Sequence, residues 1–452
     1  MGVLSARSID YLDRVRSTYW FLPLIMTIVS MVFAALLLKI DQQIPNALLD
    51  DKWYILHIDP SSVHSTLISI AGTALGVIGV VFSITLVPLT IAASQYGPIL
   101  IRSFLRDTTT QFVLGTYSST IGFCVIVLMS FQFDSDSSNV PLISVTFAIL
   151  MLLVSLGMLL YFFHHVAEGL QASKIIENVG NEIEREIRIE RLFSKYHENR
   201  DEFEEDEKKL RSIVVQNGKA VLATKSGYIR AIDYDGLLKI AEKNNMIFYL
   251  KHLAGDFVTP GDQLLLTWPA SHEVPELPTH INRSYILGDN RTMQQDIEYG
   301  MTSLVIIASR ALSPAINDPI TPTMCLHRLG VALSMLAECK PKSSYHRDSV
   351  QKLRVIADPI SFERMAGVSF NLIRQYGRCN ADVMISILKT INSVAAHVHT
   401  DTEKDILLRH AQLALEDSDL SLPSPYDKER VHQAYDETLS SIKNIDSNQK
   451  RK

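Results

Sequence analysis

Cysteine is scarce in this chain of 452 residues, which contains only four. Structural zinc sites and disulfide frameworks need cysteines in pairs at short, regular spacings, whereas these four are scattered along the chain. The sequence therefore predicts neither a disulfide-stabilised fold nor a cysteine-based metal site. The four are Cys124, Cys325, Cys339 and Cys379.

Motifs for catalysis are missing as well. The chain has no Gly-x-Ser-x-Gly elbow, no phosphate-binding loop and no His-Glu-x-x-His sequence, each of which is tied to a defined chemistry. Two histidine pairs remain. His164 and His165 stand at the inner end of an apolar run, and His397 and His399 face different sides of a helix. We expect no enzyme activity, no metal and no cofactor.

Charged residues are absent from four long stretches, although they make up 20% of the chain. A helix needs about 20 apolar residues to cross the hydrocarbon core of a membrane. The stretches predict an α-helical domain of four membrane spans over residues 1–163, with a kink at Pro88 because proline removes a backbone hydrogen bond. The spans run from about Tyr19 to Leu38, Val63 to Ala93, Phe112 to Phe133 and Leu142 to Phe163.

Small residues recur at steps of four and three in the second span. Such a stripe lets another helix approach closely, because helix association in lipid depends on packing and polar contacts. Two uses stay open: the lining of a pore, or a packing seam within one chain or between chains. The stripe consists of Ser65, Ser69, Gly72, Gly76, Gly79 and Ser83.

Basic residues predict the orientation, since Lys and Arg concentrate on the cytoplasmic side of spans. Only Lys39 and Lys52 lie in the opposite loops. We therefore expect both termini in the cytoplasm, and the span-length first apolar run predicts no secretory signal. The cytoplasmic basic residues are Arg7, Arg14, Arg16, Arg102, Arg106, Lys174, Arg185, Arg188 and Arg191.

Beyond His164 the composition is that of a soluble cytoplasmic body. The net charge of the chain is −6 with both signs interspersed, so we expect no nucleic-acid partner. An apolar stripe at helical spacing predicts an amphipathic stalk over residues 164–211, which packs either on a neighbouring subunit or on the chain's own cytoplasmic domain. The stripe consists of Ile176, Val179, Ile183 and Ile187.

Residues 212–270 alternate β-branched runs with Gly and Pro, which predicts a small β domain. Its turns at Ser226–Ile229 and Ala254–Asp262 resemble those of a barrel-sandwich of the biotinyl or lipoyl kind. The lysine hairpin that carries the prosthetic group in those domains is missing, and Lys225 precedes the first turn instead. We therefore expect the shape without the cofactor, and an exposed Lys225.

Residues 271–340 predict a helical domain that carries the densest polar cluster. One helix is expected from about Thr292 to Leu312, and a second from Pro319 with Asp318 as its N-cap. The cluster either converges on a ligand or a neighbouring subunit, or consists of caps and ion pairs that fix the fold. Its members are Arg291, Asp296, Arg310, Asn317 and Asp318.

Amphipathic patterns predict C-terminal helices over residues 341–440, and the polar composition of residues 441–452 predicts a disordered tail. The fold class is thus a four-span helical membrane domain followed by a cytoplasmic α+β region and a helical body. The predicted C-terminal helices include Ile360–Tyr376, Ala381–Val398 and Thr402–Leu415.

Several segments occur in an order that resembles a bacterial family of predicted inner-membrane proteins, whose domain has no assigned function. The resemblance extends to about Lys340. It implies four membrane helices, a cytoplasmic β/α region and the bacterial inner membrane, and it implies no activity. The segments are Arg14–Trp20, Gly79–Leu86, Ser94–Pro98, Ser226–Asp233, Gly255–Gly261 and Ala311–Pro319.

The order of parts favours one function and leaves an alternative. A glycine-rich span followed by a cytoplasmic β domain and a helical body is loosely similar to small-conductance mechanosensitive channels. We therefore favour a homo-oligomeric, channel-like or pore-forming protein with a cytoplasmic regulatory domain, whose partners are membrane lipid, further copies of the chain and unidentified ions or a small ligand. The alternative is a membrane-anchored sensor or scaffold whose cytoplasmic body binds a protein or small ligand. A membrane enzyme would need a catalytic constellation that the sequence lacks.

Overall fold

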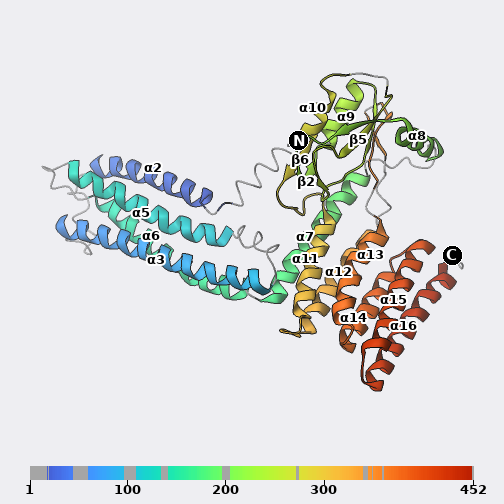
Figure 1. Cartoon of the computed structure of the whole chain (residues 1–452). Coiled ribbons are helices and arrows are strands. Elements are labelled where there is room, and N and C mark those ends of the chain that lie inside the picture. Colours follow the sequence, from blue (N-terminus) through green and yellow to red (C-terminus); the bar gives the residue numbers. More distant parts are fainter. Residues whose placement is uncertain are drawn as a thin grey trace. The chain divides into compact units, whose positions relative to one another are not determined.

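The computed structural model describes residues 18, 20–43, 60–95, 108–133, 141–169, 171–195, 204–270, 274–338, 345–348, 350–358 and 361–449. The chain divides into two compact units, an apolar helical unit that ends at Gln171 and a larger unit that begins at Ala172. Figure 1 follows the chain through both units.

Four helices form the apolar unit, with α5 as the common partner of the other three. α2, α3 and α6 each pack against α5 (Figure 1). Large apolar side chains face outward, such as Val29 of α2 and Leu153 of α6, which are 61% and 60% exposed. Helices that are apolar all round suit a lipid environment. The helices are α2 (Phe21–Gln43), α3 (Pro60–Gln95), α5 (Thr108–Phe133) and α6 (Leu142–Gly169).

Glycines on α5 let α2 approach closely. A Cβ atom added at Gly122 would lie 2.9 Å from Thr27 Cγ2 and 3.1 Å from Met31 Cγ, and one at Gly115 would overlap the side chain of Met26. Close approach at glycine is the usual basis of tight helix packing in membranes. The small-residue seam inside this unit therefore lies on α5, which the sequence analysis did not single out.

A carboxylate at the end of α2 caps the start of α6. Asp41 accepts hydrogen bonds from the backbone N–H groups of Ile143 and Ser144, both at 3.0 Å, and from the Ser144 hydroxyl at 2.6 Å. The first N–H groups of a helix have no partner within the helix, so an acidic oxygen stabilises them. Asp41 thereby ties α2 to α6.

Five described helices are long and apolar enough to cross a membrane, whereas the sequence predicts four spans. The fifth, α12 (Ile320–Glu338), belongs to the larger unit, where α7, α11 and α14 pack against it. Its side chains Cys325, Leu326, Leu329 and Leu333 are fully buried. A helix whose apolar face packs on several other helices can match the apolar composition of a membrane span, which explains the additional candidate.

Two sheets form the β unit within the larger unit. One has the strand order β1-β5-β3-β8-β7 and the other β4-β2-β6. β8 pairs in parallel with β3, and the other described pairs are antiparallel. The elements are β1 (Lys219–Leu222), β2 (Gly227–Ile232), α9 (Tyr234–Lys243), β3 (Ile247–Leu250), β4 (Phe257–Val258), β5 (Gln263–Trp268), α10 (Leu277–Ser284), β6 (Tyr285–Gly288), β7 (Tyr345–Arg347) and β8 (Leu353–Ile356).

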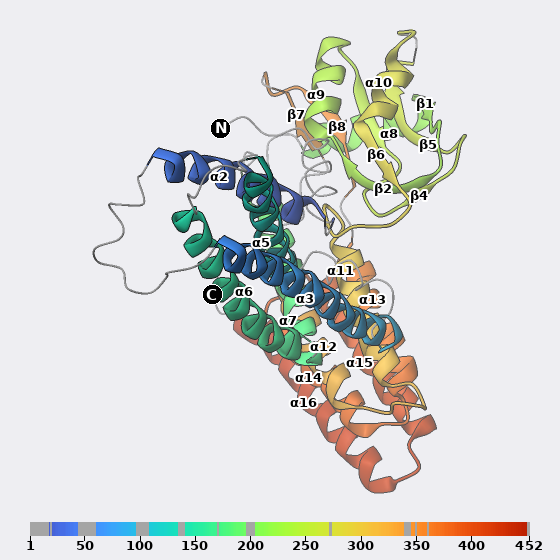
Figure 2. The same cartoon turned by 90° about the vertical axis from the view of Figure 1, so that its left-hand side faces the viewer.

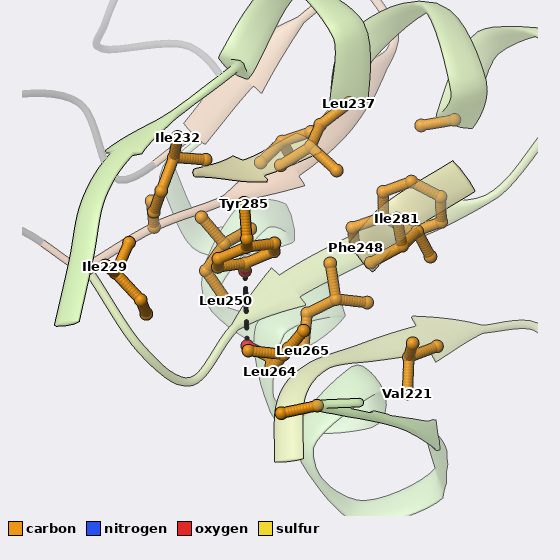
Figure 3. Packing of buried hydrophobic residues seen from close by; sticks show 14 of the residues in the cluster. Val221, Ile229, Ile232, Leu237, Phe248, Leu250, Leu264, Leu265, Ile281 and Tyr285 are labelled. Carbon is orange, nitrogen blue, oxygen red and sulfur yellow. Dashed lines mark hydrogen bonds between the residues drawn. The ribbon is translucent and has the colours of Figure 1, made fainter. Parts of the chain in front are cut away.

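The predicted barrel-sandwich is not confirmed. Strands from outside residues 212–270 complete both sheets, and α9 and α10 interrupt the strand order. In the core, Phe248 packs with Leu265 and Ile281, and the Tyr285 hydroxyl donates to the Leu264 carbonyl at 3.3 Å (Figure 3). Periodicity reports local structure, so it does not reveal strands that join a sheet from far along the chain. Lys225 is exposed, as expected.

A helical body completes the larger unit. Its helices α11 and α12 pack against α7, and α13 to α16 pack on these two helices and on one another, while α8 packs on β3 and β5 (Figure 2). α11 begins at Ile297 rather than near Thr292, because Asp296 caps its first turn. The further elements are α7 (Ala172–Lys195), α8 (Glu204–Asn217), α11 (Ile297–Ala311), α13 (Phe362–Gly377), α14 (Ala381–Ala395), α15 (Asp401–Ser421) and α16 (Pro425–Gln449).

The stalk stripe packs on the chain's own body. All four of its residues are buried on α7. A Cβ atom at Gly300 of α11 would lie 2.7 Å from Ile183 Cγ1, and Arg328 of α12 pairs with Glu184 of α7 at 3.4 Å. Of the two partners left open by the sequence, the structure therefore supplies the larger unit of the same chain.

The C-terminal segment differs from the predicted disordered tail over residues 441–452. α16 continues to Gln449, and residues 450–452 lie outside the described part of the chain. Val431, Thr438 and Ile442 are buried at helical spacing. A few apolar contacts in a polar sequence are enough to hold a helix against its neighbours, because tertiary packing provides most helical stability.

Replacing Gly122 by Leu should destabilise the apolar unit by about 1–3 kcal/mol, because the new side chain collides with Thr27 and Met31. Gly157→Leu on α6 is the matched control, since no atom lies within 4 Å of a Cβ added at Gly157. Thermal melting of both variants in one detergent compares them. Equal melting temperatures for the two would contradict the seam.

Candidate functional site

The small-residue stripe of α3 lies on an uncovered face. Its six residues are all exposed, and no described atom comes within 4 Å of a Cβ added at Gly72, Gly76 or Gly79. The Ser69 and Ser83 hydroxyls donate to carbonyls one turn earlier, at 2.8 and 2.9 Å. The face is therefore smooth and its hydroxyls are satisfied within the helix.

The buried face of α3 is opposite the stripe. Each buried residue precedes a stripe residue by two positions, which is a rotation of about 200° at about 3.6 residues per turn. The stripe therefore points away from the other helices of its unit and serves no described intramolecular seam. The buried residues of α3 are Val63, Leu67, Ile70, Ala74 and Val81.

The sequence predicts a kink at Pro88, and the structure shows that the helix is continuous there. α3 continues through this position to Gln95, and its length of 36 residues exceeds the number needed to cross a bilayer.

Arg291 and Asp296 form a bidentate ion pair at the start of α11. Arg291 Nε and Nη2 donate to the two carboxylate oxygens of Asp296 at 2.8 and 2.9 Å. Asp296 is 1% exposed and also accepts from the Tyr299 backbone N–H at 3.0 Å. Burial raises the pKa of the Asp296 carboxyl, against the opposing effect of Arg291.

The β unit touches this ion pair directly. Gly255, with φ of +97°, leaves room for it, and a Cβ there would lie 2.9 Å from Arg291 Nη2 and overlap the Asp296 carboxylate. Gln295 accepts a hydrogen bond from the Ile232 backbone N–H at 2.9 Å and donates to the Ile232 carbonyl at 3.2 Å. The segment before α11 is thus hydrogen-bonded to β2, and no local sequence motif predicts this contact.

A second ion pair continues from α11 into α13. Glu298 of α11 pairs with Arg364 at 2.7 Å and lies 4.0 Å from Arg291. We call Arg291, Asp296, Glu298 and Arg364 the junction cluster. It joins the β unit to two helices of the body.

The other predicted cluster residues lie at the opposite end of α11. Arg310 is in its last turn, and Asn317 and Asp318 follow in the connection to α12. Asp318 accepts from the Ile320 N–H at 2.8 Å and the Thr321 hydroxyl at 2.5 Å, so it caps α12 as expected. The structure therefore brings together Arg291 and Asp296 but keeps Arg310, Asn317 and Asp318 apart from them.

The histidines form no metal site in the described part of the chain. No group of three or more His, Cys, Asp or Glu residues there could hold a metal ion. His164 pairs with Glu168 at 3.2 Å, and His397 pairs with Glu338 at 2.7 Å. One histidine of each predicted pair thus has an acidic neighbour.

A buried histidine of α15 was missed by the sequence analysis. His410 is 6% exposed, and its ring lies 5.5 Å from the ring of Phe370. Burial, with Arg374 and Arg409 nearby, lowers the pKa of His410 to about 4. The described residues offer no hydrogen-bond partner to its Nδ1. The body therefore holds this imidazole in its neutral form.

Comparison with known proteins places the chain in an established group. A family model described as "Predicted membrane protein (DUF2254)" matches residues 16–393, which confirms the resemblance seen in the ordered motifs and extends it past Lys340 into α14. Uncharacterized proteins of Mycobacterium tuberculosis and Mycobacterium bovis are each 29% identical over 417 residues, which cover 89% of this chain and 77% of the relative. No solved structure matches significantly.

Arg291→Met should lower the free energy of unfolding by about 3 kcal/mol, because it leaves the buried Asp296 carboxylate without its partner. Adding Asp296→Asn should recover part of the loss, since the amide oxygen still accepts from Tyr299 without a charge. Chemical denaturation of the single and double variants measures the loss of unfolding free energy and its recovery. A double variant less stable than Arg291→Met would contradict the interpretation.

Acidification from pH 7 to pH 5 should destabilise the body through His410. The unfolded state binds a proton near its ordinary pKa of about 6.5, whereas the folded state resists protonation until a pKa of about 4. Stability therefore falls as the pH drops from 6.5 to 5, by about 2 kcal/mol. His410→Gln should lose less Tm between these pH values than the exposed control His399→Gln. Equal losses would rule out His410 as the source.

Proposed function

Because the chain belongs to the DUF2254 family of predicted membrane proteins, we propose that it crosses the bacterial inner membrane four times and assembles into a homo-oligomeric, channel-like complex. The larger unit is its cytoplasmic regulatory body. Membrane lipid and further copies of the chain are its partners, and the conducted species is an ion or small solute.

The proposed spans are α2, α3, α5 and α6. Each is long and apolar enough, and basic residues flank the ends that are assigned to the cytoplasm. With four spans, both termini are cytoplasmic. α12 is excluded from the spans because other helices of the larger unit pack against it.

The uncovered stripe of α3 carries the channel proposal. A protein that functions as a monomer in lipid would present large side chains on this face, as α2 and α6 do. On α3, large side chains such as Leu75 and Phe82 are also exposed, but the stripe between them presents only glycine and serine to its surroundings. Such a face suits the lining of a path around an axis of identical helices, in which the serine oxygens, whose hydrogens are donated within the helix, still accept hydrogen bonds from water. Cyclic symmetry then places every copy of α3 in an equivalent position.

The junction cluster supports a regulatory role for the body. It fixes the β unit to α11 and α13 through charged pairs, and α11 packs in turn on α7, which begins three positions after α6 ends. A ligand or partner that shifts the sheets would therefore act on the helix that leads to the membrane.

A sensor or scaffold remains the alternative. It would use the α3 stripe as a closed dimer seam and the body as a binding surface. The same smooth face suits such a seam, so oligomeric state and conduction must be measured together.

Gly76→Leu tests the proposal. In planar bilayers with a salt gradient, wild-type protein should give discrete current steps, and Gly76→Leu should abolish them while preserving the oligomer, because leucine fills an axial path. Gly157→Leu on α6 is the control, since its Cβ is equally unhindered. It should conduct as wild type.

Two other results would separate the alternatives. Loss of the oligomer in Gly76→Leu, with a silent wild-type protein, would assign the stripe to a seam and favour the scaffold. Normal assembly and conduction in Gly76→Leu would remove the stripe from both functions.

A further inference from the structure

Three connections of the helical body lie at the same end. Gly377, which ends α13, packs near Leu312 at the end of α11, where a Cβ would lie 3.5 Å from Leu312 Cδ1. Arg430 of α16 pairs with Asp382 of α14 at 2.6 Å. The α11–α12, α13–α14 and α15–α16 connections therefore share one end of the body, which we call the turn end (Figure 2).

Large exposed apolar side chains gather at the turn end. Two of them, in or next to the α11–α12 connection, are isoleucines, and two others are tyrosines. Apolar side chains that gather on one surface mark contacts with a partner or a membrane, whereas singly exposed ones are normal. They are Ile316 at 50% exposure, Ile320 at 70%, Tyr376 at 53%, Leu420 at 85% and Tyr426 at 70%.

The opposite end of the body is polar. There His397, after α14, pairs with Glu338 of α12 at 2.7 Å, and Thr400 and Glu403 form a capping box at the start of α15. His399 is exposed between them. No large exposed apolar side chain occurs in the described residues of the α14–α15 connection. The apolar character is thus specific to one end.

The path of the chain indicates what contacts the turn end. Figure 1 shows α7 running antiparallel to α11, and Ile183 of α7 lies against Gly300 near the start of α11, so α7 begins at the turn end. α6 ends at Gly169, just before it. The turn end is therefore the part of the body closest along the chain to the proposed membrane exit.

We propose that the turn end docks on the cytoplasmic leaflet of the bilayer, with Ile316 and Ile320 entering the headgroup region. Tyrosine is favoured at membrane interfaces, because its ring is apolar and its hydroxyl is polar. This inference rests on the proposed crossing by α6 and is independent of channel activity. It gives the body a fixed contact with lipid.

The charges at this end predict an apolar rather than an electrostatic contact. Asp382 and Asp427 are both paired with Arg430, at 2.6 and 3.3 Å, and Asp318 is used in capping. Because acidic side chains accompany the basic ones, anionic lipid gains little. Docking should therefore be similar in neutral and anionic vesicles.

Site-directed fluorescence on the full chain in liposomes tests the docking. The background carries Cys339→Ser and Cys379→Ser, since Cys124 and Cys325 are buried. Single cysteines at Ile316, Leu420 and His399 are labelled with an environment-sensitive dye and exposed to lipid-borne nitroxide or aqueous iodide. We expect the nitroxide to reduce the Ile316 and Leu420 signals about twofold or more, since interfacial residues lie near the acyl boundary. Iodide should quench the polar-end His399 probe instead.

Contrary outcomes are distinct. If Ile316 and Leu420 respond as His399 does, the turn end is in water and the proposal fails. If they are shielded from both quenchers, a second copy or another protein covers them, which also overturns it. A probe at Leu156 of α6, 52% exposed, reports the crossing itself. Lipid quenching at Leu156 without quenching at Ile316 rejects docking alone, whereas no quenching at Leu156 rejects the membrane topology.

Discussion

The buried carboxylate of Asp296 is the contact on which the larger unit depends. A buried charge is unfavourable unless it is paired and hydrogen-bonded, and Asp296 meets this requirement with Arg291 on one side and the first turn of α11 on the other. Gly255 of the β unit provides the space in which the pair forms. The first turn of α11, the segment before it and the β unit therefore meet at this ion pair, and each of the three depends on the position of the other two.

Local chemistry could be predicted from the sequence, and tertiary partners could not. The capping role of Asp318 follows from the residues beside it and was found as expected. The burial of the α7 stripe also follows from helical spacing. By contrast, Gln295 bonds to Ile232 from 63 positions away, and β8 joins β3 from still farther along the chain. Such contacts depend on the completed fold, so no periodicity encodes them.

Small residues show the same limit within the apolar unit. Those on α3 form the more regular pattern, yet a Cβ added at Gly72, Gly76 or Gly79 would meet no described atom, whereas the isolated Gly115 and Gly122 on α5 lie against α2. Small residues in a sequence indicate that another helix can approach closely. Whether a partner is present depends on which face the rest of the chain covers. Likewise, the apolar composition of α12 suggests a span, although its surroundings are protein.

The path of the chain through the five-stranded sheet has a consequence for biosynthesis. β3 emerges early, but β8, its parallel neighbour, and β7 follow only after α11 and α12. Non-local pairing of this kind is slow to form. During translation, the edge of β3 that pairs with β8 therefore stays unpaired until residue 356 has left the ribosome. An unpaired strand edge is a template for association with other chains. The apolar helices all precede this stage in the chain, so the sheet is the later of the two units to be completed.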